Sequence, residues 1–217
     1  SKLADVLCRV DTEFSMLTDD DDFLSNDSIN HSINFLKKNI NYSTSGGIIG
    51  GFHLIERDKL DLNKYTLPKV SNSIINETAY DRIMKPYIFH YPHTFYDVHR
   101  SGFQKKNFKI LDENNFKEIT MVEMLTEALD VIDGKIHRHN QLFGMRQLNF
   151  NNSSHKQFIN EKGSIVNRAI FGELSQDCKK WLNIISEQIS SNDNIDYEKV
   201  KKEVAEAYVK NVEYYLH

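Results

Sequence analysis

The chain has 217 residues and a formal net charge of −4, with 40% hydrophobic and 27% charged residues. A chain of this size and composition can bury a core without disulfides or a structural metal. The mild acidity disfavours a broad nucleic-acid-binding surface, for which a basic domain is expected, although it allows a local basic patch.

The cysteines and the apolar segments predict where the protein resides. Cys8 and Cys178 both fall in helix-like stretches, which favours free thiols in a reducing compartment over a disulfide. The apolar runs fall short of the ~20 residues that a membrane span needs, and the first residues lack the apolar core of a signal peptide. We therefore expect a soluble, cytoplasmic protein with no membrane partner.

Two amphipathic helices are predicted near the start of the chain, over residues 1–18 and 26–40, from apolar residues at helical spacing. Between them lies the acidic run of residues 19–22, interpreted as an exposed loop, with metal binding as the alternative. A glycine-rich stretch over residues 42–52 follows. It favours a turn leading into a strand at 48–55 over an anion-binding or nucleic-acid-clamping loop, because the basic residues of such loops are missing.

The middle of the chain predicts a helix over 71–84 that Pro86 ends, and a strand over 104–111 in which apolar and polar residues alternate. A helix over 120–136 has the clearest pattern, with Thr120 and Glu123 as a capping box. Residues 141–163 are polar and rich in asparagine, which fits either a short hairpin or an irregular excursion.

The C-terminal part predicts two helices, one starting near residue 164 and one over 196–215, joined by a short loop as an antiparallel pair. Together these elements predict a mainly helical α+β fold: a single domain, 1–217, with a small sheet and a C-terminal antiparallel helix pair. The helical hairpin 164–217 is a candidate for a separable unit.

Side chains that can take part in catalysis or metal binding are most concentrated in residues 87–103, which contain three histidines and six aromatic residues. Neutral imidazole is a common ligand for zinc and similar metals. The spacings His90-x-x-His93 and His137-x-His139 let two rings meet one ion, so these four residues are the predicted ligands of a divalent metal such as zinc. Established zinc motifs are missing, and the alternative is that these histidines pack among tyrosines.

Residues Asp97, His99 and Arg100 are the predicted catalytic group. Histidine exchanges a proton near neutral pH and arginine offers a forked donor, so the three side chains suit a pocket for an anionic or phosphorylated group. A surface ion pair beneath an aromatic patch is the alternative interpretation of the same residues. His139, Asn152 and His155 also follow the order of a His-Asn-His endonuclease core, without its spacing.

Two functions of different classes fit these patterns, and the sequence leaves open whether the chain is an enzyme. The first is a non-enzymatic binding or assembly protein that uses the aromatic–histidine surface, with a protein partner or self-association into a homo-oligomer. The alternative is a histidine-centred, metal-dependent hydrolase of the phosphodiesterase or nuclease class. A local nucleic-acid-binding patch would use the basic residues Lys105, Lys106, Lys109, Lys135, Arg138 and Arg146.

Overall fold

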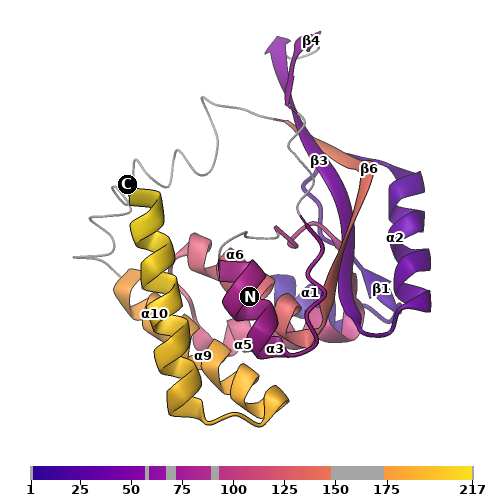
Figure 1. Ribbon diagram of the computed structural model, residues 1–217. Helices are drawn as coiled ribbons and strands as arrows, with labels where there is room; N and C mark the ends of the chain where they lie inside the picture. The colour runs from indigo at the N-terminus through magenta and orange to yellow at the C-terminus, as the bar shows by residue number, and fades with distance from the viewer. Residues whose placement is uncertain (1, 57–58, 67–71, 89–92, 148–173, 217) are drawn as a thin grey trace.

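A computed structural model describes residues 2–56, 59–66, 72–88, 93–147 and 174–216. Figure 1 shows a curved sheet with helix α2 (Asn26–Lys38) on one side and the other helices on the opposite side. This arrangement confirms the mainly helical α+β prediction. The sheet thus has two separately covered faces, and each face carries its own set of polar side chains.

The sheet is built around two long strands that run parallel, β3 (Tyr42–Glu56) and β6 (Lys135–Gln147). On the other side of β3 the short strand β5 (Val98–Arg100) pairs antiparallel, and β1 (Phe14–Ser15) pairs with β5. Strand β2 (Phe23–Leu24) pairs with β6, so the order is β1-β5-β3-β6-β2. Strand β4 (Lys59–Thr66) pairs with the far end of β3 and extends the sheet beyond this order.

The glycine-rich stretch is part of β3. The strand predicted over 48–55 is present but starts at Tyr42, so the turn predicted before it is wrong. The end of the helix predicted over 120–136 and the start of the polar stretch 141–163 instead form the strand β6. Periodicity could not show this, because both strands are covered on both sides and their pairing is interrupted by register shifts.

The strand predicted over 104–111 is wrong, because these residues lie in helix α5 (Ser101–Asn114). The alternation of Phe108 and Ile110 with polar residues was coincidental. The buried side chains Gln104, Phe108 and Leu111 recur at intervals of four and three, which is a helical period. This helical period is hard to recognise in the sequence because the buried face of α5 also contains polar residues.

Several helix boundaries differ from those predicted. Helix α1 (Lys2–Cys8) ends ten residues before the predicted end. In place of the helix over 71–84, the structure has α3 (Ala79–Arg82) followed by a π-helical turn, η1 (Ile83–Tyr87), which contains Pro86. Helix α6 (Ile119–Asp133) is confirmed, but it begins after Glu118 without a side-chain cap, so the predicted capping box is wrong.

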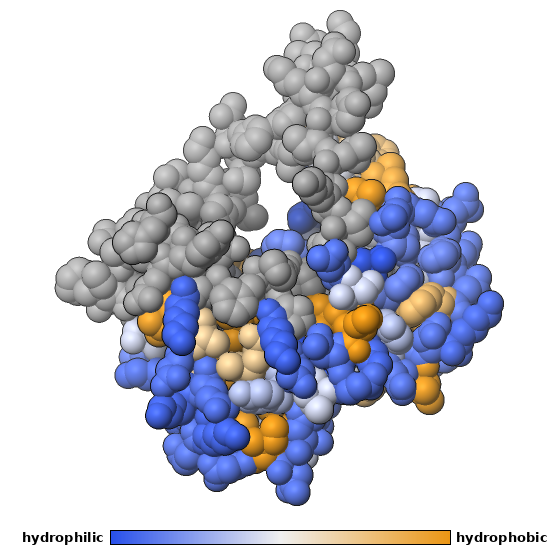
Figure 2. Space-filling model, viewed as in Figure 1, coloured by the Kyte–Doolittle hydropathy of each residue, from blue (hydrophilic) through white to orange (hydrophobic). Residues whose placement is uncertain are grey.

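The C-terminal helices α9 (Leu174–Asp193) and α10 (Tyr197–Leu216) form the predicted pair. Their buried residues join the same hydrophobic cluster as those of α6, while their outer surface is mainly hydrophilic (Figure 2). Whether this hairpin is separable stays a prediction. Within the described residues, each helix is too short or too polar to span a bilayer.

Candidate functional site

Strand β6 directs adjacent side chains to opposite faces of the sheet. Ile136 belongs to the hydrophobic cluster of α6, and Arg138 forms an ion pair with Asp97 on that same side. His137 and His139 contact α2 on the other side. This alternation is the normal period of a β-strand. It separates the candidate residues into an acidic cluster and a histidine cluster.

Gly46 and Gly47 in β3 leave room for both clusters. A Cβ atom on Gly46 would lie 1.9 Å from Asp97 Oδ1 and 2.6 Å from the Arg138 guanidinium. A Cβ atom on Gly47 would lie 2.5 Å from His139 Cε1 on the other face. The two glycines are therefore explained by close packing, and neither an anion nor a nucleic-acid-clamping loop is needed to account for them.

The acidic cluster consists of Asp97, Glu127 and Asp130, with Arg138 and His99 beside them. Asp97 is fully buried; Arg138 donates a hydrogen bond of 2.5 Å to Oδ1, and Thr44 donates one of 3.2 Å to Oδ2. Burial raises the pKa of Asp97, and the Arg138 guanidinium opposes this shift. Both oxygens of Asp97 are thus committed to partners within the protein.

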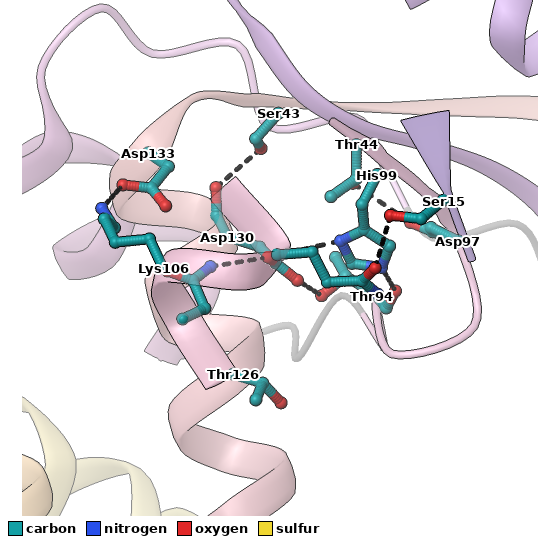
Figure 3. A network of polar contacts seen from close by, with 12 residues as sticks. Ser15, Ser43, Thr44, Thr94, Asp97, His99, Lys106, Thr126, Asp130 and Asp133 are labelled. Carbon is teal, nitrogen blue, oxygen red and sulfur yellow. Dashed lines mark hydrogen bonds and ion pairs between the residues drawn. The ribbon is translucent and has the colours of Figure 1, made fainter. Parts of the chain in front are cut away.

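Asp130 lies on α6 at the centre of this network (Figure 3). Its carboxylate accepts hydrogen bonds from Thr94 at 2.7 Å and Asn107 at 3.1 Å. His99 Nδ1 lies 3.4 Å away, while His99 Nε2 lies 3.0 Å from the carbonyl oxygen of Thr94. Burial disfavours the charged imidazole, yet Asp130, Asp97 and the Thr94 carbonyl together outweigh this effect and raise the pKa of His99. The ring is held between a carboxylate and a carbonyl.

Glu127 lies one turn before Asp130 on α6, and its side chain is 4% exposed. Its Oε2 atom has no hydrogen-bond partner among the described residues, and Oε1 lies 3.8 Å from Nδ1 of His93. Burial, with the nearby charge of Asp130 added to it, raises the pKa of Glu127 to about 8. At neutral pH this side chain therefore holds a proton in the folded protein.

The histidine cluster consists of His31 on α2 and His137 and His139 on β6. The ring centroids of His31 and His139 are 4.8 Å apart, those of His137 and His139 6.0 Å, and those of His31 and His137 6.2 Å. Phe35 stacks on His137 at 3.5 Å from the side of α2. Residues separated by more than 100 positions in the sequence thus bring three imidazoles to one place.

Serine hydroxyl groups orient two of these rings. Ser45 lies 2.9 Å from Nδ1 of His137, and Ser32 lies 3.1 Å from Nε2 of His139. The backbone N–H of Gln141 donates a longer bond of 3.3 Å to Nδ1 of His139. Burial, together with the neighbouring His31, lowers the pKa of His137 and of His139 to about 4. Both imidazoles are therefore neutral at physiological pH.

In the observed ring orientations, the nitrogen atoms of His31, His137 and His139 do not all point toward one common position. Among the described residues, the His, Cys and carboxylate atoms that gather within 4.8 Å belong to Asp19, Asp21 and Asp22. Arg146 pairs with Asp19 at 2.8 Å and with Asp22 at 3.4 Å, so this acidic run is partly neutralised by the protein itself. A metal in the histidine cluster would require its rings to turn about χ2.

The predicted metal ligands fall in different places. His137 and His139 lie together, whereas His93 lies on the other face, where its carbonyl accepts a hydrogen bond from Arg138 and its imidazole is exposed. His90 lies outside the described residues, as do Asn152 and His155 of the suggested endonuclease order. The structure thus does not bring His93 into the histidine cluster.

The predicted catalytic residues divide in a similar way. Asp97 and His99 both belong to the buried acidic cluster, but Arg100 is used elsewhere. Its guanidinium donates hydrogen bonds to the carbonyl oxygens of Leu36, Asn39 and Tyr42, where α2 ends and β3 begins. Arg100 therefore holds α2 against the sheet, and a catalytic role for it stays a prediction.

The sequence reading missed His31, Glu127 and Asp130. His31 precedes Phe35 by one helical turn, so both share one face of α2, and this spacing was the available signal. Glu127 and Asp130 interrupt an otherwise apolar run of buried residues on α6. Acidic side chains within such a run need an explanation, because buried carboxylates are rare unless they are paired.

The basic residues considered for a nucleic-acid-binding patch are largely engaged in ion pairs. Lys106 pairs with the buried Asp133, Lys135 with Glu77 at 2.6 Å, and Arg146 with the acidic run. Arg138 pairs with Asp97. Nucleic acid as a partner stays a prediction that these contacts do not favour.

Comparisons with known proteins leave the function to be argued from this geometry. A scan against protein-family models finds no match to the chain. A search of curated proteins finds no sequence of significant similarity.

Proposed function

We propose that the chain is a histidine-centred, metal-dependent hydrolase that binds a zinc-class divalent ion through His31, His137 and His139. The observation that carries this proposal is the approach of three imidazole rings, with centroids 4.8 to 6.2 Å apart. His31 supplies a third imidazole from α2, in place of the ligands predicted from residues 90 and 93.

The protonation state of the cluster supports metal binding. A metal displaces protons from its ligands, so an imidazole that is already neutral binds without that cost. The pKa of about 4 for His137 and His139 meets this condition. The Ser45 hydroxyl at Nδ1 of His137 is a partner of the kind that orients metal-ligating histidines and leaves Nε2 for the ion.

Two observations favour the rotation of these rings that coordination would require. His31 is exposed, so its imidazole has solvent to turn into, and the Gln141–His139 bond of 3.3 Å is a weak one to lose. His31, His137 and His139 would hold the ion, and a zinc-class ion bound by three imidazoles would supply a water of lowered pKa as the nucleophile. Because His31 is at the surface, an extended substrate such as a phosphodiester can reach the ion.

Metal analysis combined with a hydrolysis assay tests this proposal. We expect stoichiometric zinc, manganese or nickel in the wild-type protein, and hydrolysis of bis-p-nitrophenyl phosphate that a chelator abolishes. His31→Ala and His137→Ala should each lower metal affinity by about 10-fold or more. The matched control is His93→Asn, which removes an imidazole on the other face and keeps a residue that tolerates its φ of 47°.

Three outcomes would contradict the proposal. They are a wild-type protein that binds no metal, equal metal loss in the His93→Asn control, and bound metal without hydrolysis. The last result would leave a metal-binding protein and remove the enzymatic part of the proposal.

Assembly through the sheet edge is a second candidate. Strand β2 ends the strand order, and Phe23 on it is 66% exposed, while Leu142 on the neighbouring β6 is 44% exposed. An edge strand with exposed apolar side chains is a template for pairing with another chain. If the protein is a homo-oligomer, sedimentation should show that Phe23→Ser dissociates it, whereas Ile75→Ser, an equally exposed position elsewhere, should not.

A further inference from the structure

We propose that Glu127 is the anchor of a binding site for a small primary alkylamine, on the face of the sheet opposite the histidine cluster. The ligand's ammonium group would donate a hydrogen bond to Oε2 of Glu127. This site is independent of the proposed metal centre, since the two lie on different sides of β3 and β6.

The first argument comes from the hydrogen bonds of the acidic cluster. Asp97 is bonded by Arg138 and Thr44, and Asp130 is bonded by Thr94 and Asn107. Glu127 differs, because its Oε2 is buried and has no hydrogen-bond partner within the described residues. Leaving a buried polar atom without a partner costs about 1–3 kcal/mol, more if it is charged. A ligand that donates to this atom would recover that free energy.

The second argument comes from charge. Three carboxyl groups, those of Asp97, Glu127 and Asp130, face one arginine and His99. Within the part of the chain that the structure describes, the cluster therefore has one positive charge fewer than negative charges when all its acids are ionised. Partial desolvation and the nearby Arg138 guanidinium lower the pKa of His93, which disfavours the charged imidazole as the source of the missing charge.

The third argument selects the class of cation. A single open oxygen suits a single N–H donor, whereas a calcium or magnesium ion needs about six oxygen ligands. The oxygens of Asp97 and Asp130 already accept hydrogen bonds within the protein, so they are not available to complete such a coordination shell. Beside Glu127 the exposed imidazole of His93 lies 3.8 Å from Oε1, which places the carboxyl one side chain away from solvent.

Binding would exchange a proton for the cation. The protonated Glu127 carboxyl releases H⁺ to solvent, and the resulting carboxylate pairs with the ammonium group, so charge is conserved. At pH 7 a carboxyl group with a pKa of about 8 is mostly protonated. We therefore expect about one proton released per amine bound.

Calorimetry with n-butylammonium chloride tests this inference in the full chain. Titrations at pH 7 in two buffers of different ionisation enthalpy should show saturable binding with release of about one proton. Tetramethylammonium, which has the charge but no N–H, should bind at least about 10-fold more weakly. Glu127→Gln should abolish proton release and weaken binding, while Glu113→Gln, an exposed glutamate on α5 outside the acidic cluster, should leave both unchanged.

Several results would overturn the inference. The first is an absence of saturable n-butylammonium binding to the wild-type protein, which needs no variant to interpret. The others are equal binding of tetramethylammonium, unchanged binding in Glu127→Gln, and binding of a lysine-containing peptide without binding of the free amine. None of these results depends on whether a metal occupies the histidine cluster, so the proposal of a hydrolase is tested separately.

Discussion

Gly47 and His139 lie so close across the sheet that a Cβ atom on the glycine would stand 2.5 Å from the ring carbon Cε1. The carbonyl oxygen of Gln141 lies at the same distance from that Cβ position. Backbone and ring together fix the spacing of β3 and β6 at this point, so an added methyl group must displace one of them.

Gly47→Ala should therefore destabilise the protein by about 1–3 kcal/mol, as overpacking in a tightly packed site does. Urea unfolding measures this change. Gly102→Ala is the matched control, because a Cβ atom there meets nothing within 4 Å and the position lies in α5. The control should raise stability by about 0.5–1 kcal/mol, since alanine favours helix over glycine. Equal effects of the two substitutions would contradict the steric account.

Arg82 should be essential for stability although it belongs to neither cluster. Its guanidinium is buried and donates hydrogen bonds to the backbone near the end of α6 and to the backbone just before α3. The acceptors are the carbonyl oxygens of Asn76, Glu77, Val131 and Ile132. Arg82→Met should cost at least about 3 kcal/mol, because it leaves several of these carbonyls unsatisfied.

Thermal unfolding of Arg82→Met and of Arg9→Met gives the comparison. Arg9 forms an exposed ion pair with Asp5 one turn away, and its side chain is 76% exposed. Its replacement should cost less than about 0.5 kcal/mol. A loss of that small size in Arg82→Met would show that the carbonyls find other partners.

Glu127 should make the protein less stable as the pH rises. A carboxyl group whose pKa rises on folding, here from 4.5 to about 8, binds a proton more tightly in the folded state. Its contribution to stability is complete below pH 4.5 and is lost as the pH rises through 8. The loss over this range is about 3–5 kcal/mol.

Glu127→Gln removes that titration, so its free energy of unfolding should fall less between pH 5 and pH 8 than that of the wild type. The contributions of Asp97 and Asp133, whose pKa values are also raised by burial, remain in both proteins. Urea unfolding at the two pH values measures the difference. Parallel pH dependences of the two proteins would show that Glu127 has an ordinary pKa.

The C-terminal hairpin should depend on the rest of the chain. Trp181 and Ile185 on α9 are buried in the same cluster as Leu125 and Leu129 on α6. A peptide of residues 174–217 should therefore show little helical circular dichroism alone, because its apolar face has lost its partner.

In the full chain Ile185→Ala should lower the free energy of unfolding by about 2–5 kcal/mol. The exposed Val209→Ala should cost far less. If the isolated peptide of residues 174–217 is folded, the hairpin is a separable unit and its predicted dependence on α6 is wrong.

The sequence allowed prediction of the fold class and of the helices with regular apolar stripes. Helix α6 and the C-terminal pair were predicted from hydrophobic periodicity, and their apolar side chains pack into a common core. Helix α5 was misread because Gln104 and Asn107 are buried for hydrogen bonding, so polarity no longer marks its outer face. Periodicity identifies a buried face only where that face is apolar.

The candidate site could be predicted only in part, for a related reason. His137 and His139 were identified from their spacing, and Asp97 and His99 from the density of polar side chains around them. Their neighbours His31 and Glu127 come from α2 and α6, far away in the sequence. Only the parallel pairing of β3 with β6 determines which helix meets which face, and no local pattern carries that information.

The parallel pairing also has a consequence for how fast this chain reaches its native state. Tyr42 pairs with Lys135, so the central strands meet only after a loop of roughly ninety residues has closed. Pairing over such separations slows folding relative to helical proteins of similar stability. Helices α5 and α6 can form early from neighbouring residues, whereas both polar clusters must wait for the strands to align. A kinetic intermediate would thus contain the helices but neither cluster.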